Sequence, residues 1–171
     1  MSKNKSIVRD LEKKRAEFAY ECVDEMVKDC KNFKEEDIEK FFDKWVDFLG
    51  KEKSDIKDKS KFLKSILNCD NYKSYVKKIP SLIQTNGLAA TFAFMYSKKG
   101  TYEVIYKQVE KWLKEERKIK KDEEELIRWM INLPSPEYRR VTNEVMGIFV
   151  WLRRFAEGMI EKDEDGKEKK E

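Results

Sequence analysis

The chain lacks histidine altogether and has only three prolines, six glycines and three cysteines in 171 residues. Without an imidazole it has no side chain whose ordinary pKa suits the general base of a nucleophilic triad. The glycines form no phosphate-binding loop, and no C-x-x-C or Cys/His set offers metal ligands. The acidic residues fall mostly in mixed-charge runs, and Glu144 and Glu157 have no evident partner. We therefore predict that the protein is not an enzyme and carries no cofactor or metal.

Long apolar runs are also missing. No run approaches the roughly 20 residues that span a bilayer. The basic start of the chain is not followed by the apolar segment of a signal peptide. We therefore expect no membrane contact and a cytoplasmic location.

The three cysteines are Cys22, Cys30 and Cys69. Cys22 and Cys30 are separated along one predicted helix by about 12 Å, which is too far for a disulfide. We interpret all three as small buried hydrophobic residues.

The residues that are abundant favour helices. Lysine and glutamate dominate the composition, and four Trp, seven Tyr and ten Phe provide bulk for a core. Apolar residues recur at helical spacing along most of the chain, and no convincing strand pattern occurs. The prediction is an all-α protein, a compact single-domain helical bundle of about seven helices over residues 1–161. Residues 162–171 are expected to form a charged flexible tail.

The clearest helix follows Pro134. Its apolar residues alternate in steps of three and four, which places them in one stripe. They are Tyr138, Val141, Val145, Ile148, Leu152, Phe155 and Met159. Ser135 is a plausible N-cap, and Pro136 suits the first helical position. Two arginine pairs, Arg139–Arg140 and Arg153–Arg154, lie two heptads apart on one flank, a separation of about 21 Å. A packing seam beside a cationic edge suggests contacts with both protein and a polyanion.

Charge is unevenly distributed. Residues 71–100 contain five lysines and no acidic residue, so this stretch carries +5 and the remainder nets −1. Lys73, Lys77 and Lys78 share a helix face, and Tyr72 and Tyr75 alternate with them. Lysines and aromatic rings on one surface can bind RNA. A solvated lysine surface is the alternative, and for each tyrosine we favour packing in the core.

Four segments resemble a known family. They are KKRAEFA at 13–19, YKSYVKKIP at 72–80, IQTNGLAATFAF at 83–94 and WLRRFAEG at 151–158. In combination they resemble the small all-helical subunit of the Cmr complex, the type III-B CRISPR effector that targets RNA. The resemblance covers roughly residues 9–31 and 70–161. Residues 33–68 depart from the pattern, and we predict that they are a helical insertion.

The resemblance implies a non-catalytic structural subunit of an antiviral ribonucleoprotein. Such subunits stack in a minor filament and help to form the channel for the guide RNA–target RNA duplex. The implied partners are other Cmr subunits, above all the backbone subunit, further copies of the chain, and the duplex, with no small-molecule substrate.

The candidate contacts to the RNA backbone or to other subunits are Lys73, Lys77, Lys78, Arg139, Arg140, Arg153 and Arg154. Some of these arginines could instead form intramolecular ion pairs. One alternative function is a helical protein-interaction adaptor without nucleic-acid contact, and a second is a nuclease.

Overall fold

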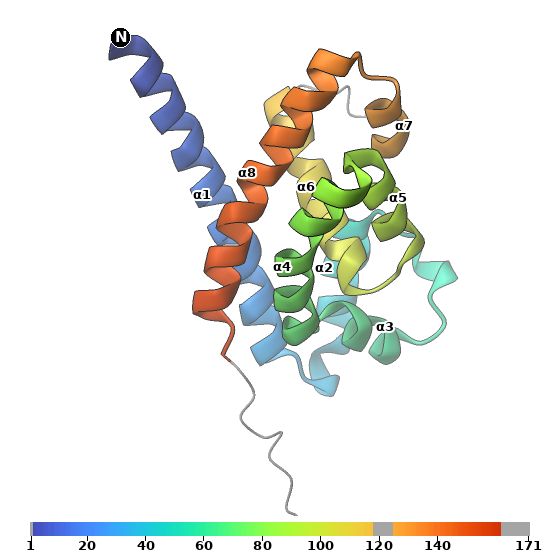
Figure 1. Cartoon of the computed structure of the whole chain (residues 1–171). Helices are drawn as coiled ribbons and strands as arrows, with labels where there is room; N and C mark the ends of the chain where they lie inside the picture. The colour runs from blue at the N-terminus through green and yellow to red at the C-terminus, as the bar shows by residue number, and fades with distance from the viewer. Residues whose placement is uncertain (1, 118–124, 162–171) are drawn as a thin grey trace, which may run out of the picture.

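The computed structural model describes residues 2–117 and 125–161, and this part of the chain forms one helical body (Figure 1). It contains eight α-helices and two 3-10 turns, and no strand. The helices are α1 (Ser2–Asn32), α2 (Ile38–Leu49), α3 (Lys59–Ile66), α4 (Cys69–Asn86), α5 (Leu88–Ser97), α6 (Thr101–Arg117), α7 (Leu126–Ile131) and α8 (Ser135–Met159), and the turns are η1 (Glu35–Asp37) and η2 (Lys53–Asp55). The all-α prediction is confirmed. The predicted tail at 162–171 lies outside the described residues.

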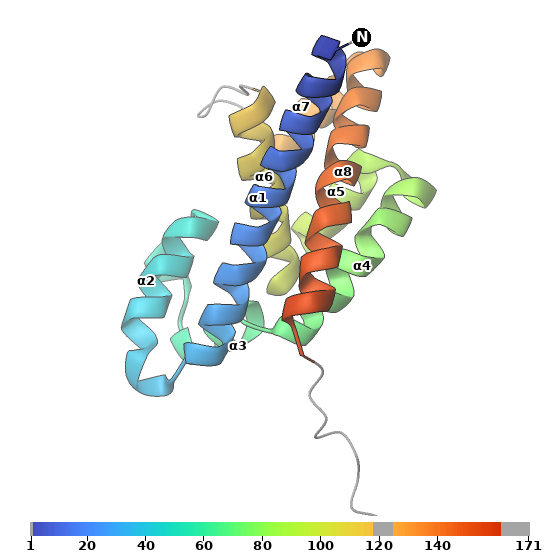
Figure 2. The ribbon, with the colours of Figure 1, turned by 90° about the vertical axis from the view of Figure 1, so that its left-hand side faces the viewer.

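Helices α1 and α8 are far apart in the sequence but lie side by side and run in the same direction (Figures 1 and 2). The apolar stripe of α8 makes this packing possible, since Val145, Ile148 and Leu152 are completely buried. Tyr138 and Met159, near the two ends of the stripe, are half-buried. Helix α4 packs on α8 as well, so α8 lies between α1 and α4 (Figure 2).

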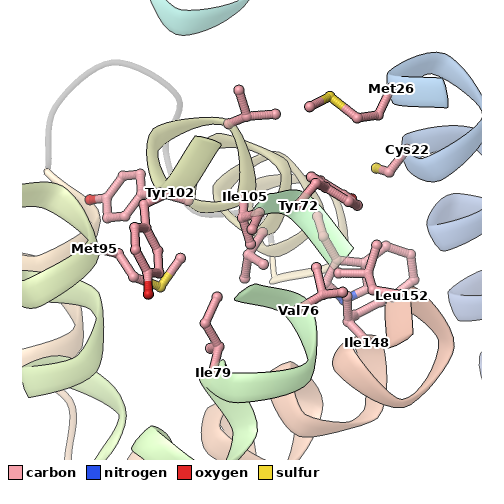
Figure 3. Close-up of a cluster of buried hydrophobic side chains, with 14 of the residues drawn as sticks. Cys22, Met26, Tyr72, Val76, Ile79, Met95, Tyr102, Ile105, Ile148 and Leu152 are labelled. Atoms are coloured by element: carbon pink, nitrogen blue, oxygen red, sulfur yellow. The ribbon is translucent and has the colours of Figure 1, made fainter. Parts of the chain in front are cut away.

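The core is built by side chains from all eight helices, and Figure 3 shows part of it. Met26 of α1, Val76 of α4, Met95 of α5, Ile105 of α6 and Leu152 of α8 have no exposed surface. Burying a side chain of this size stabilises the fold by about 1.5–3 kcal/mol relative to leaving it in water. Because helices distant in the sequence supply this core, the surfaces of α4 and α8 are held on a common rigid frame.

The segment 33–68, which we predicted to be an insertion, shares this core. Helices α2 and α3 pack on each other and on α6. The rings of Phe42 and Phe62 meet edge to face with centroids 5.9 Å apart. Trp45 is buried, and its indole nitrogen donates to the Asp29 carboxylate of α1 at 2.9 Å. These contacts tie the segment to the end of α1.

Two helix boundaries lie near the contact of α5 with α8. Gly87, with a φ of +85°, follows the last residue of α4. The prediction that Ser135 caps α8 is wrong, because the helix already includes Ser135 and its N-cap residue is Pro134. A side chain of α8 also completes the start of α5: the hydroxyl of Tyr138 accepts a hydrogen bond from the backbone N–H of Ala89 at 3.0 Å. It thereby satisfies a backbone donor in the first turn of α5, which has no partner within its own helix.

Candidate nucleic-acid interface

Three of the candidate cations meet at the carboxyl end of α8. The Lys77 ammonium lies 3.5 Å from Oε1 of Glu157, and Nε of Arg153 lies 3.2 Å from the same atom. The hydrogen bonds from Arg153 and, with a smaller effect, from Lys77 hold the pKa of Glu157 below its ordinary value. Lys73 is half-buried, and its Nζ donates to the Ile160 carbonyl at 2.6 Å. The structure therefore joins cations of α4 and α8 that are about 80 residues apart in the sequence.

The other cations at this end are less constrained. The Arg154 guanidinium lies over the ring of Trp151, 5.5 Å from its centroid. Lys78 is exposed and has no ion-pair partner among the described residues. An exposed ammonium without a carboxylate partner can exchange its water for a phosphate oxygen without breaking an internal pair.

The remaining arginines lie near the other end of α8. Arg140 is exposed and pairs with Glu137 at 2.8 Å. Arg139 is exposed too, and within the described part of the chain it has no ion-pair partner. The rise of the helix separates these arginines from Arg153 and Arg154 by about 21 Å. The seven candidates thus form two groups, five near the end of α8 and two near its start.

The tyrosines that alternate with the lysines of α4 are packing residues. Tyr72 is completely buried, and its hydroxyl donates to the Gln108 side chain at 2.8 Å. Burial raises the pKa of Tyr72 well above its ordinary value. The ring of Tyr75 stacks on Tyr102 with centroids 3.8 Å apart. The packing interpretation is therefore confirmed for both, because Tyr72 has no exposed surface and Tyr75 packs against the core through Tyr102.

Sequence reasoning missed the partner of Glu144. This carboxylate is buried, accepts two hydrogen bonds from Arg15 of α1 and accepts a third from Nε1 of Trp112 at 3.0 Å. A Cβ at Gly147 would lie 2.8 Å from the Arg15 guanidinium, so glycine at this position leaves room for the pair. The only sign of this pair in the sequence is Gly147, a glycine within a strongly helical stretch, and it does not identify Arg15 as the partner of Glu144.

An aromatic group on the α1–α8 surface was also missed. Tyr20 meets Phe155 edge to face at 5.5 Å, and Trp151 stacks against Phe155 at 5.8 Å. Nε1 of Trp151 donates to Glu12 of α1 at 3.0 Å. Tyr20 is about half exposed, so part of this aromatic surface faces solvent.

Within residues 2–117 and 125–161, no group of three or more cysteine or acidic side chains is placed to hold a metal ion. None of the helices described is long and apolar enough to span a membrane. The arrangement on α4 and α8 can hold a polyanion or a protein surface through charge and shape.

A rigid helical body that presents separate cationic groups on adjacent helices is typical of a binding or scaffold protein. The model of the family described as CRISPR-associated protein (Cas_Cmr5) matches residues 54–159. The chain therefore belongs to this family of small subunits of the type III-B CRISPR effector, the Cmr complex. The predicted family is confirmed, and three of the four segments that resembled it lie within the match. The match contains α3 to α8, while α1 and α2 precede it.

Proposed function

We propose that this chain is a non-catalytic structural subunit that helps to form the minor filament and the guide RNA–target RNA channel of a Cmr complex. Membership of the family implies association with other Cmr subunits in CRISPR defence, and members are in general structural rather than catalytic. The fold suits this role, because a core shared by all eight helices keeps the surface rigid.

The observation that carries the proposal is the excess of cations where α4 and α8 meet. Five candidates lie there, and Glu157 is the one carboxylate that pairs with any of them among the described residues. Glu157 neutralises a single charge of the five. Phosphate contacts need only cations held in position on a rigid frame, whereas reading bases would need side chains that reach base edges. The channel role requires only the first kind of contact.

The two groups of cations have different parts in this proposal. Lys77, Lys78, Arg153 and Arg154 contact the backbone of the duplex. Arg139 and Arg140, about 21 Å away along α8, contact the backbone subunit or the next copy of the chain in the filament. Lys73 acts mainly through the Ile160 carbonyl, where it holds the end of α8 against α4.

Purification of the tagged protein from its host tests the proposal. A guide RNA of uniform length and the other Cmr subunits should be recovered with it, and nuclease treatment should not release the subunits that contact it directly. Recovery of protein partners without RNA would instead support an adaptor that makes no nucleic-acid contact. Metal-dependent RNA cleavage by the isolated chain, absent from a mock purification, would show that the chain is a nuclease.

A further inference from the structure

Two of the three cysteines lie where the end of α1 passes the start of α4. Cys30 lies in the last turns of α1, and Cys69 is the first residue of α4. Sγ of Cys69 lies 3.8 Å from the Met26 carbonyl oxygen, one helical turn before Cys30. The sequence did not predict this arrangement, since the only pair it offered on one helix was Cys22 and Cys30.

The two thiols also face the same hollow in the surface. Cys30 and Cys69 are half-buried and line a cavity of about 370 Å³ together with Val27, Leu67 and Met159. The neighbouring Cys69 side chain, ahead of burial, raises the pKa of Cys30. Cys22 differs, because it is buried and burial is what raises its pKa. A small reagent that enters the cavity therefore meets both thiols.

We propose that Cys30 and Cys69 are a modification site, at which a small-molecule disulfide oxidises the two thiols to an intramolecular disulfide. The thiolate of one cysteine attacks a sulfur of the reagent, whose S–S bond breaks and releases one thiol. The second cysteine then attacks the protein sulfur of this mixed disulfide and releases the second thiol. The protein loses two electrons and two protons, and one molecule of the reagent is reduced to two thiols.

The bond would tie together the two ends of the segment that contains α2 and α3. Residues 31–68 would become a closed loop in the unfolded chain, which lowers the entropy of the unfolded state. For a loop of this length in a chain of this size, we expect the melting temperature to rise by about 10 °C. The bond would also fix the start of α4, one turn before Lys73. This inference does not depend on the proposed function.

The reaction should be slow at neutral pH. Thiolate is the attacking species, and the raised pKa of Cys30 keeps it protonated. We expect the rate of oxidation to increase between pH 7 and pH 9. Such a pair stays reduced during brief exposure to oxidant and closes on prolonged exposure.

The test uses the full chain incubated with oxidised glutathione at pH 8.5, followed by quenching in acid. Thiol counting in denaturant should give one remaining thiol of three, and peptide mapping should find Cys30 linked to Cys69. The Cys22→Ser variant should form the same bond, whereas Cys30→Ser and Cys69→Ser should not. Dithiothreitol should reverse both the bond and the increase in melting temperature.

Several results would overturn the proposal. These are glutathione adducts without the internal bond, disulfides between chains, formation of the bond only in protein unfolded by urea, and a linked protein that melts no higher than the reduced one. Circular dichroism of each variant before oxidation shows that it is folded. Cys30→Ser and Cys69→Ser each remove one thiol of the pair. If neither variant forms the bond, misfolding of one variant cannot be the reason that the bond is missing.

Discussion

Arg15 and Glu144 are 129 residues apart in the sequence and form a two-point ion pair that joins α1 to α8. Nε of Arg15 donates to Oε1 of Glu144 at 3.1 Å, and Nη2 donates to Oε2 at 2.8 Å. The side chains are only 14% and 8% exposed. Parallel hydrogen bonds between guanidinium and carboxylate are stronger than those of neutral groups. The pair thus fixes the register of the two longest helices.

Removing one member of this pair should destabilise the protein strongly. Glu144→Ala leaves the Trp112 indole nitrogen without its acceptor and leaves Arg15 with Glu12 as its remaining carboxylate partner, in a largely buried site. We expect the free energy of unfolding to fall by about 3 kcal/mol, measured by urea denaturation. Arg140→Ala is the matched control, because its exposed pair with Glu137 should contribute less than about 1 kcal/mol.

The double variant Arg15→Met with Glu144→Met distinguishes the pair from the packing around it. Replacing both charges with apolar side chains removes the cost of burying an unpaired charge. The double variant should therefore be more stable than Glu144→Ala. If Glu144→Ala unfolds at the same urea concentration as the wild type, the pair does not join the helices as we describe.

The carboxylate of Glu12 should make stability depend on pH in the acidic range. The hydrogen bond from Trp151, followed by the interaction with Arg15, lowers the pKa of Glu12 below 4.5. A carboxyl group with a lower pKa in the folded state stabilises that state above its unfolded pKa. This contribution is lost as the pH falls from about 5 through the folded pKa.

Comparison of the wild type with Glu12→Gln measures this contribution. The variant should be less stable at pH 7, and the difference should shrink as the pH is lowered from 5 to 3. Urea unfolding at five pH values in this range suffices. A difference that is constant with pH would mean that the ionised form of Glu12 is not specifically stabilised.

Tyr72→Phe separates packing from RNA binding. The substitution keeps the buried ring and removes the hydroxyl that donates to Gln108, so stability should fall by about 1–2 kcal/mol. Because Tyr72 is completely buried, target-RNA affinity of the assembled complex should not change. Chemical denaturation and a filter-binding titration give the two values. A large loss of RNA affinity in a folded variant would contradict the packing role.

Charge reversal on α4 tests the proposed phosphate contacts. Lys77→Glu with Lys78→Glu should leave the fold intact, because both side chains are exposed. We expect target-RNA affinity of the assembled complex to fall roughly tenfold near 0.15 M salt and the slope of log K against log salt to decrease by about 2. The loss should be smaller at high salt, where counterion release contributes less.

The control for this experiment is Lys40→Glu with Lys57→Glu, which changes the net charge equally on the α2–α3 segment. Both of these lysines are exposed, and neither lies on α4 or α8. The control should retain wild-type affinity at every salt concentration. Equal losses of RNA affinity in the two double variants would mean that only the net charge of the protein matters. Unchanged affinity in the α4 variant would mean that Lys77 and Lys78 do not contact the RNA.

Much of the fold could be predicted from the spacing of apolar residues along each helix. The three- and four-residue steps of α8 identified its buried stripe, since any helix with this spacing must cover one apolar face. Val145, Ile148 and Leu152 are buried as expected. The role of Ser135 was mistaken because α8 begins one residue earlier than predicted, with Pro134 in the N-cap position.

The candidate nucleic-acid interface was harder to predict from the spacing of residues along the sequence. Helical spacing placed Lys73, Lys77 and Lys78 on one face and predicted that Arg153 and Arg154 lie together. It could not show that Lys77 and Arg153 share Glu157, because that depends on how α4 packs against α8.

By itself, the sequence determined that the chain is helical, that α8 has one buried face, and that cations gather on α4 and α8. Each of these properties depends on residues three or four positions apart, whose relation the helix itself sets. Only the tertiary structure decided that Arg15 meets Glu144, that Lys77 meets Glu157 and that Cys30 and Cys69 line the same cavity. These partners are brought together by the packing of entire helices, and the register of that packing is a property of the whole core.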